Sequence, residues 1–247
     1  MTISGRRTAT ATGAMLSDPF CVGNLHDATD SLFDPEFWRS RGELTEVTGG
    51  RGAAWYITAP AGAVQGERRW VLRHFRRGGF MARFSRDRYV WAGEGKVRAF
   101  AEWRLLDELN QHGLPVPKPV AARYSRVGLC YRCDLITQRI GNARPLSAVL
   151  SLDALPEIQW HAIGTAVARL HRAGVDHADL NAYNILLDGQ GVVSVIDFDR
   201  GRVRAQGPWT LRNLQRLRRS LDKIARGLPP DRFSPRTWEW LMAGYTG

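Results

Sequence analysis

The stretch HADLNAYNILL (residues 177–187), followed by VIDFD (residues 195–199), decides how the rest of this sequence is interpreted. It contains two acids and an amide, Asp179, Asn184 and Asp197, beside short apolar runs that are typical of buried strands. Phosphoryl transfer from ATP needs a carboxylate that deprotonates the attacking hydroxyl and oxygen ligands that hold Mg²⁺. The stretch therefore predicts ATP and Mg²⁺ as cofactors, with Asp179 as the base and Asn184 and Asp197 as metal ligands.

The alternative for the same stretch is a loop of solvated Asp and Asn side chains that simply joins a helix to a strand. The apolar runs on either side favour the first interpretation, because they would place both acids at one edge of a cleft. His177 is expected to orient the backbone of the loop, since the chemistry needs a carboxylate at Asp179.

Upstream of this stretch, strand-like runs at residues 44–48, 55–58 and 70–75 predict a meander. Its first turn carries Gly49, Gly50 and Gly52, and glycines let backbone N–H groups approach phosphate oxygens closely. We expect this turn to cover the phosphates of ATP; an ordinary glycine-rich hairpin turn is the alternative.

Residues 97–112 change to helical spacing and stop before Gly113, and strand-like composition returns at residues 127–140. The deciding stretch resembles motifs of the protein-kinase-like superfamily, and this resemblance implies a phosphate-binding lysine on the last strand of the meander. The sequence has Arg73 there, so either Arg73 takes that role or the phosphates are anchored differently. Glu102, on the helix, is the natural ion-pair partner of that strand residue; a solvent-facing glutamate is the alternative.

Downstream, residues 156–172 and the leucine pattern from Leu211 to Ile224 predict helices, and residues 192–196 predict a strand. Residues 1–30, rich in Thr, Ala and Gly at their start, are expected to be a poorly ordered tail. The pattern predicts an α+β fold of two lobes: an N-lobe of antiparallel sheet plus one helix (31–140) and a reduced, mostly helical C-lobe (141–247).

The chain of 247 residues has a formal net charge of +11, which predicts attraction to a nucleic acid, an anionic membrane or a phosphorylated substrate. No helix-turn-helix, zinc-finger or RNA-binding signature accompanies the charge, so we expect no nucleic-acid partner. No apolar run approaches the length of a membrane span. Cys130 and Cys133 have the gap of half a metal site, but without a second pair they are expected to be buried thiols on a strand.

The two motifs of the deciding stretch resemble the catalytic loop and the metal-binding element of the protein-kinase-like superfamily. Further runs make the resemblance closer: VLRHFRRGG (residues 71–79), EWRLL (102–106) and GLPVP (113–117). With them, the chain resembles the 3-deoxy-D-manno-octulosonic acid (Kdo) kinases of lipopolysaccharide assembly from about residue 33 to residue 221. In that family an arginine at the position of Arg73 is expected. Only 50 residues follow Asp197 and no A-P-E-like element of protein kinases appears among them, which argues for a small-molecule, sugar or lipid-linked acceptor over a protein.

The resemblance implies a protein-kinase-like fold and transfer of the γ-phosphate of ATP to the 4-hydroxyl of Kdo on a lipid A precursor, at the cytoplasmic face of the inner membrane. A heptose or an aminoglycoside is the alternative acceptor. An anionic leaflet and an anionic substrate would both attract the excess positive charge. We expect two groups of arginines to meet these anions: Arg76, Arg77, Arg83, Arg86 and Arg88, and the helical Arg212, Arg216 and Arg219.

Overall fold

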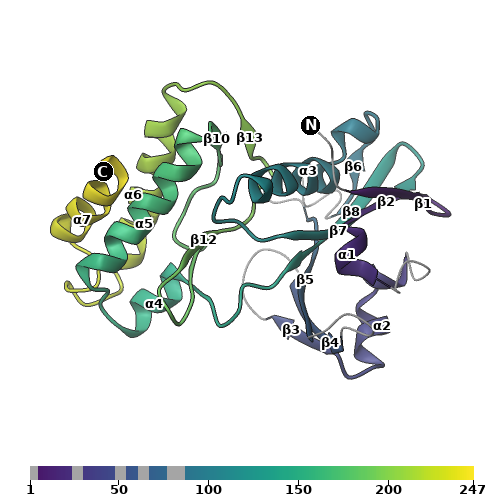
Figure 1. Ribbon diagram of the computed structural model, residues 1–247, viewed down its shortest axis with the longest axis horizontal. Coiled ribbons are helices and arrows are strands. Elements are labelled where there is room, and N and C mark those ends of the chain that lie inside the picture. Colours follow the sequence, from purple (N-terminus) through teal and green to yellow (C-terminus); the bar gives the residue numbers. More distant parts are fainter. Residues whose placement is uncertain (1–4, 24–29, 48–53, 61–66, 77–86) are drawn as a thin grey trace. The chain divides into compact units, whose positions relative to one another are not determined.

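A computed structural model describes residues 5–23, 30–47, 54–60, 67–76 and 87–247 of the chain. These residues form two compact units, which Figure 1 shows. Unit 1 comprises Met1–Glu108 and Lys118–Arg139, and unit 2 comprises Leu109–Pro117 and Ile140–Gly247. A large antiparallel sheet dominates unit 1 and helices dominate unit 2, which confirms the expected α+β class.

Unit 1 is built on an antiparallel sheet with the strand order β1-β2-β7-β8-β5-β4-β3, and β6 pairs with β8 beside this path. The neighbours β3, β4 and β5 pair in sequence order, so the expected meander is confirmed. The strands are β1 (Arg6–Ala9), β2 (Gly13–Ser17), β3 (Leu44–Val47), β4 (Ala54–Pro60), β5 (Glu67–His74), β6 (Tyr89–Val90), β7 (Pro119–Val127) and β8 (Cys130–Gln138).

One face of this sheet packs on an apolar cluster supplied by the short helices α1 (Pro19–Val22) and α2 (Pro35–Arg39) and the 3-10 turn η2 (Ser31–Phe33). Trp38 meets Trp70 edge to face in that cluster, with 6.0 Å between the ring centroids. Leu72 packs in the same cluster. Because side chains alternate along a strand, Arg73 projects to the opposite face. There the helix α3 (Arg98–Gln111), which follows the 3-10 turn η4 (Glu94–Lys96), covers the sheet.

The expectation of a poorly ordered tail over residues 1–30 is wrong for much of its length. Strand β2 pairs antiparallel with β7, and β1 pairs with β2. Ala14, Met15 and Leu16 are buried, so β2 brings apolar area to the core and its backbone groups find partners on β7. Asp18 then caps α1 by accepting a hydrogen bond from the backbone N–H of Phe20 at 2.9 Å. The composition of the first residues conceals this because the strand itself is only five residues long.

Unit 2 combines helices with short strands that carry the loops of interest. The expected helix at residues 156–172 and the expected strand at residues 192–196 are confirmed as α5 and β12. The helices are α4 (Leu146–Leu152), α5 (Glu157–Arg172), α6 (Trp209–Ala225) and α7 (Pro235–Thr246); the strands are β9 (Arg144–Pro145), β10 (Val175–Asp176), β11 (Ile185–Leu187), β12 (Val193–Val195) and β13 (Arg202–Val203). Strand β11 lies between β12 and β9, and β10 pairs with β13.

Helices α5 and α7 cross at two glycines. A Cβ atom added to Gly164 would lie 2.0 Å from the carbonyl oxygen of Leu241, and one added to Gly244 would lie 2.2 Å from that of His161. Neither distance leaves room for a methyl group. The absence of side chains at Gly164 and Gly244 therefore sets how closely α7 packs on α5.

Within the described residues, no helix combines the length and the apolar character that crossing a membrane would require.

Candidate active site

The loop at residues 176–184 joins β10 to β11 and carries Asp179 on a tight turn. The backbone N–H of Asp179 donates to the carbonyl of His177 at 2.6 Å, and Ala178 between them has a φ of 58°. The side chain of Asn181 bridges the next turn, since its Nδ2 donates to the carbonyl of Asp179 at 2.8 Å and its Oδ1 accepts from the backbone N–H of Tyr183 at 2.9 Å. The loop backbone is thus fixed by its own side chains, while the Asp179 carboxylate is 57% exposed.

Asn184 joins this loop to the second motif. Its side-chain Nδ2 donates to the carbonyl of Asp179 at 3.1 Å, and its own carbonyl accepts from the backbone N–H of Ile196 at 2.9 Å. Asp197 follows Ile196 directly, with a φ of 67°. Because the amide nitrogen of Asn184 points at Asp179, the planar amide presents its oxygen in another direction. The structure therefore brings the three motif residues into one assembly within unit 2: Asn184 is hydrogen-bonded to the backbone of Asp179 and to that of Ile196, which directly precedes Asp197.

His177 is buried at the centre of this assembly. Its Nε2 donates to the carbonyl of Ile196 at 2.9 Å, and its ring packs on Phe198 with 4.5 Å between the centroids. Burial lowers the pKa of His177, while the negative charges of Asp197 and Asp179 act in the opposite direction. Both carboxylates therefore lie within electrostatic range of this one ring. The contacts fit the expected role of His177 in orienting the backbone.

Helix α6 contacts the same loop through a stripe of polar side chains. Asn213 accepts from the backbone N–H of His177 at 3.2 Å and donates to Asp176 Oδ1 at 3.0 Å. One turn along, Arg216 donates to Asp179 Oδ1 at 3.2 Å, and a further turn along the Oγ of Ser220 accepts from the backbone N–H of Ala182 at 3.2 Å. The sequence analysis does not identify Asn213 or Ser220, because side chains that meet a distant loop leave no local signal.

Asp176 anchors the start of the loop as a buried carboxylate. Burial alone would raise its pKa, but hydrogen bonds from Asn213, the backbone of Ala178 and Arg204 outweigh burial and lower the pKa. Arg204 Nη1 lies 3.2 Å from Asp176 Oδ2. Asp176 is therefore charged and fully engaged in structural contacts, in contrast to the exposed Asp179.

In unit 1, the guanidinium of Arg73 on β5 forms an ion pair with the carboxylate of Glu102 on α3. Only 2% of the Glu102 side chain is exposed, against 26% of Arg73, so the alternative of a solvent-facing glutamate does not hold. Arg73 also lies over the ring of Phe75, 4.6 Å from its centroid. The turn with Gly49, Gly50 and Gly52 lies outside the described residues.

The side-chain oxygens of unit 2 are suited to be ligands of Mg²⁺. Among the residues that the structure describes, no group of three or more His, Cys, Asp or Glu side chains is placed to hold a metal. Mg²⁺ does not need such a cage, because it retains several waters and is commonly bound by one or two carboxylates together with substrate phosphates. The amide oxygen of Asn184 and the carboxylate of Asp197 are hard donors of the kind that this ion prefers.

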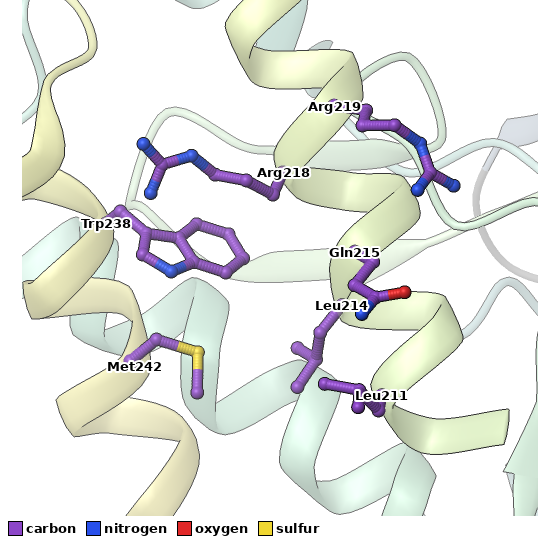
Figure 2. Close-up of a pocket in the computed structure, with 7 residues that line it drawn as sticks. All are labelled: Leu211, Leu214, Gln215, Arg218, Arg219, Trp238 and Met242. Carbon is purple, nitrogen blue, oxygen red and sulfur yellow. The ribbon is translucent and has the colours of Figure 1, made fainter. Parts of the chain in front are cut away.

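A shallow apolar groove lies between α6 and α7 (Figure 2). Leu211 and Leu214 point from α6 toward Met242 of α7, and Arg218 lies over Trp238, 5.2 Å from the ring centroid. Arg219 lies at the side of the groove away from α7. The groove encloses about 390 Å³ and is lined by Leu211, Leu214, Gln215, Arg218, Arg219, Trp238 and Met242.

Comparison with known proteins gives one consistent result. Residues 35–245 match the lipopolysaccharide kinase (Kdo/WaaP) family. A 3-deoxy-D-manno-octulosonic acid kinase from Xanthomonas axonopodis pv. citri is 48% identical over 213 residues, which cover 86% of this chain and 81% of that protein. A protein of the same name from Stenotrophomonas maltophilia (strain K279a) is 47% identical over 213 residues, with the same coverage. One from Xanthomonas oryzae pv. oryzae (strain PXO99A) is 49% identical over 203 residues, 81% of this chain and 78% of the relative.

Proposed function

Because the chain belongs to the lipopolysaccharide kinase (Kdo/WaaP) family, we propose that it transfers the γ-phosphate of ATP to the 4-hydroxyl of a Kdo residue on a lipid A precursor. Its curated relatives are named 3-deoxy-D-manno-octulosonic acid kinases, and a kinase of that name is a phosphotransferase acting on an alcohol group. The observation that supports the proposal most directly is that Asn184 hydrogen-bonds to the backbone of Asp179 and to that of Ile196, the residue before Asp197, so that the two motifs meet within unit 2.

Asp179 is the proposed general base. Its carboxylate is 57% exposed, so an acceptor hydroxyl can reach it, and its backbone is fixed by His177, Asn181 and Asn184. A base held in this way receives the hydroxyl proton as the oxygen attacks phosphorus, without first having to be ordered. The proton leaves the sugar oxygen for the carboxylate, and the γ-phosphoryl group leaves ADP for the sugar oxygen.

Asn184 and Asp197 are the proposed Mg²⁺ ligands, and the bound ion would neutralise charge on the phosphates. Arg73 is the proposed phosphate contact of unit 1, with Glu102 as the group that holds its guanidinium in place. A guanidinium offers phosphate a planar fork of donors, so arginine is chemically suited to the position. Gly49, Gly50 and Gly52 remain the proposed cover of the phosphates.

We also propose that unit 2 docks on the anionic cytoplasmic face of the inner membrane through α6 and α7. At about 100° per residue, Arg212, Arg219 and Lys223 follow one exposed stripe of α6, between the groove side chains and the stripe that contacts the 176–184 loop. The apolar groove beside this stripe would receive an acyl chain or the edge of the bilayer. A lipid-embedded acceptor could then lie with its anchor at the groove, its phosphates at the basic stripe and its sugar at Asp179.

The other arginines expected to meet anions fall into separate groups. Arg76 and Arg88 are exposed in unit 1, whereas Arg77, Arg83 and Arg86 lie outside the described residues. Arg216 is directed at Asp179 and is therefore assigned to the active site instead of the membrane stripe.

Incubation of the purified chain with ATP, Mg²⁺ and a Kdo-bearing lipid A precursor tests the proposed function. The expected product carries one new phosphate at the Kdo 4-hydroxyl, as mapped by mass spectrometry and ³¹P NMR. Asp179→Asn is the matched control: it should remain folded and bind ATP but form no product. Phosphorylation of a heptose or an aminoglycoside in place of Kdo would overturn the choice of acceptor, and a fully active Asp179→Asn variant would overturn the choice of base.

A further inference from the structure

Arg216 forms an exposed ion pair with Asp179 that contributes little to the stability of the fold. Its Nη1 lies 3.2 Å from Asp179 Oδ1, and the two side chains are 48% and 57% exposed. Ion pairs exposed to this degree contribute little to the stability of the fold. The cation at Asp179 therefore has little structural value, and its position beside the proposed base calls for another explanation.

The guanidinium is presented by a fixed part of the molecule. Asn213 and Ser220, on the same stripe of α6, hydrogen-bond to the backbone of the 176–184 loop on either side of Arg216. These contacts fix the helix against the loop that carries Asp179. An arginine mounted in this way can bind an incoming group without the helix having to move.

We propose that Arg216 is the binding site for the carboxylate of the acceptor sugar. The inference rests on the proposed function, since the substrate named for the relatives is an octulosonic acid, whose carboxylate is attached to the ring. One nitrogen of the guanidinium faces Asp179, and the other edge of the planar fork is directed elsewhere and suits a second carboxylate. Arg216 thus holds the sugar by its acid group while Asp179 receives the proton of the hydroxyl under attack.

The chemistry of the acceptor agrees with this arrangement. In Kdo the carbon that bears the carboxylate is two ring positions from the carbon that bears the 4-hydroxyl. The two groups are therefore close enough for the carboxylate to contact Arg216 while the hydroxyl contacts Asp179. A neutral sugar such as a heptose has no acid group and would leave Arg216 paired only with Asp179. Arg216 accordingly selects acidic sugars over neutral ones.

The test compares the free acid of a short Kdo-bearing acceptor with its carboxyl methyl ester, using the full-length chain and saturating ATP. Hydrogen bonds to charged groups contribute about 1.5–3 kcal/mol, so wild type should prefer the acid over the ester by roughly 10-fold to 100-fold in kcat/KM. Arg216→Ala should bring this ratio close to one while leaving the KM for ATP unchanged. Arg216→Lys, which keeps the charge but not the fork, should give an intermediate ratio.

Arg172→Ala, which removes an exposed arginine from the end of α5, is the matched control and should keep the wild-type ratio. The acid-to-ester ratio is the decisive readout because a change in fold or in Asp179 would lower both rates together. An unchanged acid-to-ester ratio in Arg216→Ala would overturn this inference and leave the proposed function intact. If Arg216→Ala does not fold, an unchanged ratio in Arg216→Lys has the same meaning. Absence of phosphorylation of the acid by wild type would overturn the proposed function and this inference with it.

Discussion

At the residue scale, Asp197 is notable because it combines a proposed metal-binding carboxylate with a left-handed backbone, at a φ of 67°. Asparagine adopts this conformation more readily than most residues, whereas alanine there adds a backbone penalty. Asp197→Asn is therefore the replacement that changes the ligand with the least disturbance of the fold.

We predict that Asp197→Asn weakens the Mg²⁺-dependent binding of ATP by at least about tenfold, because an anionic ligand is replaced by a neutral one. Titration calorimetry with ATP at several Mg²⁺ concentrations measures the effect. Asp179→Asn should bind Mg-ATP as wild type does, since Asp179 is assigned to proton transfer. A wild-type Mg²⁺ requirement in Asp197→Asn would contradict its assignment as a ligand.

The ion pair between Arg73 and Glu102 gives a second prediction for single residues. Arg73→Met leaves the buried Glu102 carboxylate, whose side chain is 2% exposed, without this cation, and breaking a buried pair typically costs about 3–5 kcal/mol. The double variant Arg73→Met/Glu102→Leu should recover part of the lost free energy of unfolding, as measured by urea denaturation of all four proteins. Additive losses would show that the two side chains are not energetically coupled.

The residues that could be predicted from sequence were those with a local signal or a fixed motif spacing. Asp179, Asn184 and Asp197 stand in two motifs, and Arg73 and Glu102 follow from a strand and a helix that were both expected. The contacts of Asn213 and Ser220 depend on how α6 packs on a loop more than 30 positions away, as the 36-residue separation of His177 and Asn213 illustrates. No periodicity within α6 marks which polar positions meet that loop.

At the scale of the element, the crossing of α5 and α7 depends on the absence of side chains. Gly164→Ala would force a methyl group against the carbonyl of Leu241, and overpacking of this kind typically costs about 1–3 kcal/mol. Alanine has a higher helix propensity than glycine. Helix propensity alone therefore predicts that Gly164→Ala raises the free energy of unfolding, whereas overpacking predicts that it lowers it. Thermal unfolding distinguishes the two, with Gly189→Ala, where the added Cβ meets nothing within 4 Å, as the control.

Three helices of unit 2 meet at His171, which makes their packing sensitive to pH. Nδ1 of His171 in α5 lies 2.9 Å from the hydroxyl of Tyr245 in α7, and its ring meets Trp209 of α6 edge to face at 5.2 Å. Burial lowers the pKa of His171 from 6.5 to about 4. The folded protein therefore keeps this ring neutral at pH values where the unfolded chain is already protonated.

We predict that this histidine destabilises the fold as the solution is acidified. The contribution of the neutral His171 ring to the free energy of unfolding is fully present above pH 6.5. It is lost as the pH falls toward about 4, and the loss amounts to up to roughly 3 kcal/mol. Urea denaturation at several pH values should give a flatter profile for His171→Asn than for wild type across this window. The partly exposed His161, on the same helix, supplies His161→Asn as the control for loss of a histidine elsewhere on α5. Parallel profiles for wild type and His171→Asn would contradict the prediction.

Some elements could not be predicted because their signals are short or ambiguous. Helix α7 begins at Pro235, and its start signal is short: a capping box between Ser234 and Thr237, next to the much longer leucine pattern of α6. Strand β7 begins at the end of the proline-rich run at residues 115–119, which is typical of a loop. Strand β8, by contrast, lies within the expected residues 127–140, where Tyr131, Ile136 and Thr137 favour a strand.

At the scale of the whole molecule, a net charge of +11 predicts binding to anionic surfaces that weakens with salt. The chain should sediment with vesicles of phosphatidylglycerol and phosphatidylethanolamine at low ionic strength and remain in solution with phosphatidylcholine vesicles. Arg219→Glu should reduce sedimentation more than Arg172→Glu, which changes the net charge by the same amount, because only Arg219 lies on the proposed membrane stripe. Equal losses in the two variants would leave net charge, and not the stripe, as the cause.

The family resemblance drawn from the motifs is confirmed across most of the chain, since residues 35–245 match the lipopolysaccharide kinase (Kdo/WaaP) family. Sequence alone supported this because the motifs span both units, from the Arg73 strand to Phe198. The assignment of residues 1–30 failed at the same scale. Strand β2 gains its stability from pairing with β7, roughly one hundred positions later, and such distant pairing has no counterpart in local composition.

The pairing of β2 with β7 also shows that the folded unit begins earlier in the chain than the segment that matches the family. The segment shared with the family begins at residue 35, yet Met15 and Val22 belong to the same apolar cluster as Trp70 and Ile136. A recombinant fragment trimmed to the homologous region would uncover an unsatisfied strand edge and part of the hydrophobic interior. Protein expressed for biochemistry should therefore retain strands β1 and β2, since the folded unit extends beyond the segment that matches the family.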